Sequence, residues 1–68
     1  MRRISIGFEG GQVLAVRVDA DAEKALRKAL GSTGWHELVV EEGEVRLDLA
    51  RIVYVQADGD GSRVGFGV

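Results

Sequence analysis

The sequence contains no cysteine and no proline, and it has a single histidine, His36. Without cysteine the chain can form neither disulfide bonds nor thiolate metal sites, and it has no thiol nucleophile. One histidine cannot supply a site that needs several imidazole ligands. Without proline, no alternating stretch is excluded from a sheet by a missing backbone N–H. The lack of cysteine is typical of a reducing compartment, and we therefore expect a cytoplasmic protein.

Long apolar runs are also missing. The basic start, Met1–Arg3, is followed by the apolar stretch Ile4–Phe8, which is too short for a signal peptide or a membrane span. The formal net charge is −2, and this small negative value gives no general attraction to nucleic acid. We therefore expect no membrane partner.

The chain has 68 residues, which is enough for one domain only, residues 1–68. A domain of this size buries only about 60% of its unfolded surface. Small domains usually gain further stability from disulfides, a metal or a partner subunit. Because disulfides are excluded and 46% of the residues are apolar, we expect a homo-oligomer.

Two alternating stretches, residues 3–8 and 13–19, predict a β-hairpin at the start of the chain. Every second residue of each stretch is apolar, which is the period of a strand. Gly10 and Gly11 lie between the stretches, and a glycine pair favours a tight turn because both residues can adopt positive φ.

A single helix of about 10 residues is predicted between Asp19 and Gly31, because aspartate favours the start of a helix and glycine its end. Apolar residues recur at helical spacing in this segment. They are Ala22, Ala25, Leu26, Ala29 and Leu30. A helix this short is unstable alone, so we expect it to pack on the sheet.

Three further strands are predicted, over Trp35–Val40, Val45–Leu49 and Ile52–Val55. Glu41–Glu44 reads as the turn between the first two, and the alternation breaks at Ala50–Arg51. The third strand is apolar on both faces, which is typical of a central strand or of a strand between subunits.

The stretch Ala57–Val68 could be a calcium loop or a turn between strands. Asp58 and Asp60 match the first ligand positions of an EF-hand loop, but Arg63 stands where that loop needs glycine. A turn explains the aspartates and glycines, and Val64–Val68 then alternates as a last strand. We therefore predict a hairpin here and no metal site.

The predicted order of elements is β-β-α-β-β-β-β. It indicates an α+β fold, in which one helix packs on a curled antiparallel sheet or small partial barrel.

No arrangement typical of an enzyme is present. His36 has no nucleophile motif around it, and Ser32 lies in a linker. Glu41, Glu42 and Glu44 flank a turn glycine, whereas acid–base catalysis needs two carboxylates in different environments of a cleft. We therefore predict no catalytic residues, no cofactor and no enzymatic activity.

Trp35 and Tyr54 are amphipathic aromatics of the kind enriched at interfaces, and core packing under the helix is the alternative for both. Gly65 and Gly67 flank Phe66, so one face of the last strand is bare backbone that another chain can approach. We expect the oligomer interface at Tyr54, Val64, Phe66 and Trp35.

Lys24, Arg27 and Lys28 are spaced to share one face of the predicted helix. Such a basic face could contact the phosphates of nucleic acid. Alternatively, it is a solvated surface with Glu23 as a local partner.

Both ends of the chain resemble a family of small actinobacterial proteins without an established activity. The matching residues are Arg3–Gly7 near the start and, near the end, Arg51–Val55 and Arg63–Gly67 on either side of an acidic, glycine-containing turn. This resemblance implies a small intracellular protein and no catalytic residues. More weakly, Val45–Gly59 is similar to the strand segment of LytTR-type DNA-binding domains.

The sequence therefore predicts a non-enzymatic, self-associating module for binding or assembly, with no small-molecule ligand identified. The alternative is a small nucleic-acid-binding or transcription-associated regulatory protein that uses the basic helix face.

Overall fold

The structure is a computed structural model and describes residues 1–57. The elements are β1 (Arg2–Phe8), β2 (Val13–Val18), α1 (Ala20–Ala29), β3 (Trp35–Val40), β4 (Gly43–Asp48), the 3-10 turn η1 (Leu49–Arg51) and β5 (Ile52–Ala57). Their order confirms the predicted α+β fold. The predicted last strand, Val64–Val68, and the turn before it lie outside the described residues.

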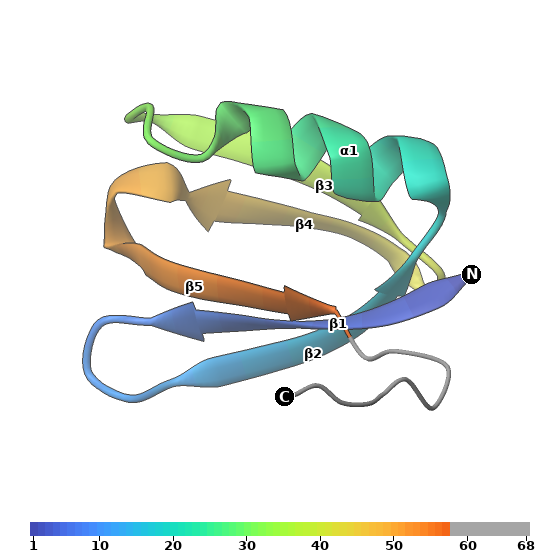
Figure 1. Ribbon diagram of the computed structural model, residues 1–68, viewed down its shortest axis with the longest axis horizontal. Coiled ribbons are helices and arrows are strands. Elements are labelled where there is room, and N and C mark those ends of the chain that lie inside the picture. The colour runs from blue at the N-terminus through green and yellow to red at the C-terminus, as the bar shows by residue number, and fades with distance from the viewer. Residues whose placement is uncertain (58–68) are drawn as a thin grey trace, which may run out of the picture.

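The described strands form two antiparallel sheets that are not closed into a barrel (Figure 1). The first sheet has the order β2-β1-β5, and the second is the β3–β4 hairpin. The helix lies along the second sheet and packs on β3. Among the described strands β1 is therefore the central one of its sheet, whereas β5 pairs with β1 alone.

The first hairpin forms as predicted. Ile4 opposes Val16 and Ile6 opposes Leu14, so the apolar residues of both strands share the face that is turned to the core. The turn between them contains two glycines with φ of 90° and 87°, a region that residues with a side chain rarely adopt.

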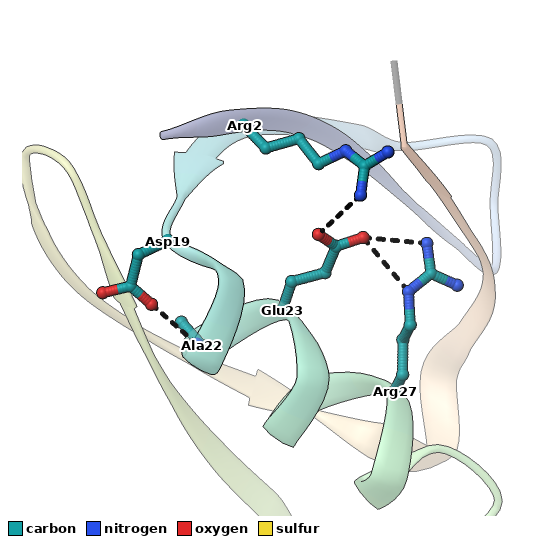
Figure 2. Close-up of polar contacts among 5 residues, drawn as sticks. All are labelled: Arg2, Asp19, Ala22, Glu23 and Arg27. Carbon is teal, nitrogen blue, oxygen red and sulfur yellow. Dashed lines mark hydrogen bonds and ion pairs between the residues drawn. The ribbon is translucent and has the colours of Figure 1, made fainter. Parts of the chain in front are cut away.

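The helix begins where the sequence predicts. The Asp19 carboxylate accepts a hydrogen bond from the Ala22 N–H at 2.8 Å, which satisfies one of the unpaired donors of the first turn (Figure 2). Acidic residues follow in the first turn and basic residues occupy the last turn, and both complement the helix dipole.

The break in alternation at Ala50 and Arg51 is the turn η1. Asp48 stabilises this turn, because its carboxylate accepts hydrogen bonds from the Ala50 N–H and from Arg51 Nε, both at 3.2 Å. The predicted strand Val45–Leu49 therefore ends one residue early, and Leu49 starts the turn while its side chain stays in the core.

The core consists of aliphatic side chains from both sheets, from the helix and from η1. Its members are Ile4, Ile6, Val18, Leu26, Leu38, Leu47 and Leu49. Leu26 is the buried apolar residue of α1, and it therefore joins the helix to the strands.

Leu26→Ala should lower the free energy of unfolding by about 2–5 kcal/mol, because it leaves a cavity where the helix meets the core. Chemical denaturation followed by circular dichroism measures the change. Lys24→Ala is the control, since this exposed helix position should change stability by less than about 0.5 kcal/mol. A loss at Leu26 no larger than at Lys24 would contradict the packing described here.

Candidate interaction surfaces

The outer face of the three-stranded sheet carries two rows of side chains without charge. In the first row Val13, Gly7 and Tyr54 lie side by side across the three strands. The next row consists of Ala15, Ser5 and Gln56. Their neighbours along β1 point into the core, so these residues point outward. We call the two rows the uncharged sheet face.

A β-bulge aligns Tyr54 with this face. The pairing of β1 with β5 shifts between Gly7 and Phe8, which oppose Tyr54 and Ile52 respectively. Val53 is the extra residue, and it is 65% exposed. Because the extra residue changes the alternation, Ile52 points inward and Tyr54 points outward.

The Tyr54 ring covers Gly7. A Cβ atom at position 7 would overlap the ring, so the glycine is the residue that permits this close approach. The side chain of Tyr54 is not part of the core, and the residue is 44% exposed. The row therefore presents a flat aromatic surface.

Gly7→Ala should displace the Tyr54 ring and lower the free energy of unfolding by about 1–2 kcal/mol, because the added methyl group overpacks the site. Tyr54 is the single tyrosine, so its ring signals in an NMR spectrum report the displacement. Ser5→Ala, on the same face of the same strand, is the matched control. Unchanged ring signals in Gly7→Ala would contradict the contact.

The outer face of the β3–β4 hairpin is different, because charged residues dominate it. Glu37 opposes Arg46 and Val39 opposes Glu44 across the two strands. Trp35 is 66% exposed on this face, and the Arg46 guanidinium lies 5.9 Å from its ring centroid. Such a cation–π contact contributes about 0.5–1 kcal/mol at an exposed site.

The predicted interface residues are therefore not gathered in one sheet. Tyr54 lies in the three-stranded sheet and Trp35 in the hairpin, and neither is packed in the core. The other two, Val64 and Phe66, lie outside the described residues, as does the stretch that was weighed as a calcium loop.

Glu23 is a buried carboxylate that two arginines hold in place (Figure 2). Its side chain is 7% exposed. Arg27 donates to Oε2 from Nε at 3.1 Å and from Nη2 at 3.0 Å, and Arg2 donates to Oε1 from Nη1 at 3.3 Å. These contacts tie α1 to the start of β1.

The two arginines also set the protonation of Glu23. Burial alone raises the pKa of this carboxyl group, but the hydrogen bonds and charges of Arg27 and Arg2 outweigh burial and lower the pKa below its ordinary value. Arg27 binds Glu23 while its side chain stays 48% exposed, and Lys24 and Lys28, the other predicted nucleic-acid contacts, are also exposed.

Glu23→Gln should lower the free energy of unfolding at pH 7 by about 1.5–3 kcal/mol, the range for a hydrogen bond to a charged group. Because the folded pKa is lowered, the contribution of Glu23 is complete above the ordinary pKa of 4.5 and is lost as the pH falls through the folded value. The stability difference between wild type and Glu23→Gln should therefore shrink below pH 4.5.

Urea denaturation of both proteins at several pH values measures this difference. Glu42→Gln, in the exposed β3–β4 turn, is the control and should match wild type throughout. A difference that stays constant or grows on acidification would contradict the lowered pKa.

The remaining candidates for chemistry are separated from one another. His36 opposes Leu47 within the hairpin, whereas Glu41, Glu42 and Glu44 lie at the exposed turn end. Glu41 pairs with Arg17, with 3.3 Å between Oε1 and Nε. Within residues 1–57, no three side chains of the types that bind metals gather into one site.

Comparison with family models, with curated protein sequences and with solved structures gives no match for this chain. The resemblance of the chain ends to small actinobacterial proteins therefore stays a prediction. No helix among the described residues is long and apolar enough to cross a membrane.

The first row of the uncharged sheet face was only partly found from the sequence. Tyr54 was singled out, but Val13 and Gly7 were not. The glycine pair of the first hairpin was a usable signal, because a turn at Gly10 and Gly11 places Gly7 opposite Val13.

Proposed function

We propose that this chain is a non-enzymatic, self-associating module of the cytoplasm, whose work is binding or assembly. The uncharged sheet face is the observation that supports this proposal. Antiparallel sheets usually alternate apolar inward and polar outward residues, and a solvated outer face would be expected to carry charges. Depletion of charge and enrichment of aromatic residues are instead the marks of an interface centre.

The position of the face suits a second copy of the chain. Tyr54 is flat and rigid over Gly7, and Val13 is 58% exposed at the other side of the row. A two-fold axis through such a row brings the same apolar surface together from both copies. Burial of both residues would remove apolar area from water in a domain that has no disulfide to stabilise it.

The nucleic-acid alternative rests on Lys24 and Lys28, because Arg27 is bound to Glu23. Two lysines on a chain with a net charge of −2 give a weak electrostatic footprint. We therefore do not advance it as a second function.

Light scattering coupled to size exclusion tests the proposal. We expect a mass that is a multiple of the 7.3 kDa chain, and Tyr54→Asp and Gln56→Asp should each reduce it, because a charge would be buried in the interface. Gln56 is exposed, so its substitution separates loss of association from loss of folding.

Ala25→Asp adds the same charge to the exposed side of α1 and is the control that should keep the wild-type mass. A wild-type protein that remains monomeric up to the highest concentrations reached would overturn the proposal. An oligomer that neither sheet-face substitution affects would show that the interface lies elsewhere.

A further inference from the structure

The outer edge of β2 offers unpaired backbone groups. The Phe8 N–H donates to the Gln12 carbonyl at 2.8 Å, so these two residues form a hydrogen-bonded pair. In an antiparallel ladder, hydrogen-bonded and non-hydrogen-bonded pairs alternate along each strand. Leu14 and Val16 therefore bond to β1, whereas Val13 and Ala15 direct their N–H and C=O groups away from it. Within residues 1–57, no backbone group of another strand pairs with these two residues.

A slot runs between this edge and the β3–β4 hairpin. At one end it holds a cavity of about 270 Å³ lined by Arg3, Ala15–Arg17 and Val40–Glu42. At the other end it holds a cavity of about 510 Å³, lined by Phe8, Gln12–Leu14 and Val45–Leu47. We call the two cavities together the edge slot.

The edge slot is closed at one end, and the inner wall of its larger cavity is apolar. The Glu41 N–H donates to the Arg17 carbonyl at 2.8 Å and joins the hairpin to β2 at that end. Leu14 and Val45 are half-buried and pack against the core. The inner wall of the larger cavity is therefore apolar.

The two edges cannot close the slot by pairing with each other. If antiparallel pairing continued from the Arg17–Glu41 contact, Val13 would oppose Val45. Val13 points outward, whereas Val45 points inward with Leu47. Paired residues of a sheet must share a face, so β4 does not pair with β2 in this register and the β2 edge stays open to an added strand.

A strand that fills this position needs apolar side chains on its inner face and small residues on its outer face. Val64–Val68 has this pattern, with glycine at every second position. At the end of the edge slot near Arg17, Glu41 pairs with this arginine and Glu42 also lines the cavity. The alternating apolar and glycine pattern is therefore the feature that fits this segment to the slot.

A second copy can supply this segment more directly than the same chain. Ala57, the last described residue, opposes Ile4 on β1, and β2 lies on the far side of β1. In its own molecule the chain would have to cross both strands before it reached the slot.

We infer that the edge slot binds residues 64–68 of a second copy as an added β-strand. This inference rests on the self-association proposed above and specifies the segment exchanged. Added strands of this kind bind through main-chain hydrogen bonds, with pockets for alternate side chains.

A complementation experiment tests the exchange. Ala15→Pro removes an outward N–H without touching the β1 pairing and blocks the slot, whereas Phe66→Asp disables the inserted segment. Each variant alone should raise the dissociation constant of self-association at least tenfold. An equimolar mixture should form one-to-one pairs, because it contains one intact slot and one intact segment.

Two control variants change the same residue or add the same charge without disturbing the proposed strand pairing. Ala15→Ser retains the N–H, and Ser62→Asp adds the same charge outside the segment, so both should associate as wild type does. Phe66→Asp, which leaves β2 unchanged, tests the exchange if Ala15→Pro fails to fold.

The outcomes separate the two proposals. If the single variants keep the wild-type mass while Tyr54→Asp and Gln56→Asp dissociate it, self-association stands and the exchange is overturned. If the variants weaken association but the mixture does not restore it, insertion from a second copy is also overturned. A monomeric wild type would remove both proposals.

Discussion

The fold depends on burying a few aliphatic side chains between two sheets that share no continuous hydrogen-bond ladder. The main-chain bond between Glu41 and Arg17 joins the two sheets at one end, whereas the bond between Glu9 and Arg51 continues the pairing of β1 with β5. The sheets are therefore joined mainly by the core, and the helix contributes to that core through Leu26. This explains why a chain without disulfides can form one domain from such short elements.

The polar contacts of Glu23 fix the orientation of two elements in addition to stabilising the fold. Glu23 brings the first residues of β1 and the middle of α1 together through Arg2 and Arg27. A buried carboxylate needs such partners, because an unpaired charge in this position would be costly. The same contacts remove Arg27 from any role that needs a free guanidinium group.

The local elements could be predicted because their signals are local. The glycine pair at Gly10 and Gly11 and the cap at Asp19 each determine the conformation of adjacent residues, and both are observed. The outward position of Trp35 could also be predicted, since Trp35 and Leu38 point to opposite faces of the strand and Leu38 is buried. The division into two sheets could not be predicted from the sequence. It depends on the long-range pairing of β1 with β5 and on a bulge that no local sequence signal marks. The edge slot depends in turn on how those sheets face each other.

The surfaces of the molecule share one physical origin. Within residues 1–57, two sheets of three and two strands leave more strand edges than a closed barrel would, and an exposed edge can pair with an additional strand. On the outer face of the first sheet, the two uncharged rows lie beside a row formed by Arg3 and Arg17, whereas charged residues dominate the outer face of the hairpin.

The pairing of β1 with β5 also has a consequence for biosynthesis. It joins Ile4 to Ala57, so the central strand of the first sheet gains its second neighbour only after residue 57 has been made. The two hairpins and the helix are built from neighbouring residues and can form while translation continues. During that interval one edge of β1 is exposed in the nascent chain, so this sheet is completed after the two hairpins and the helix have been synthesised.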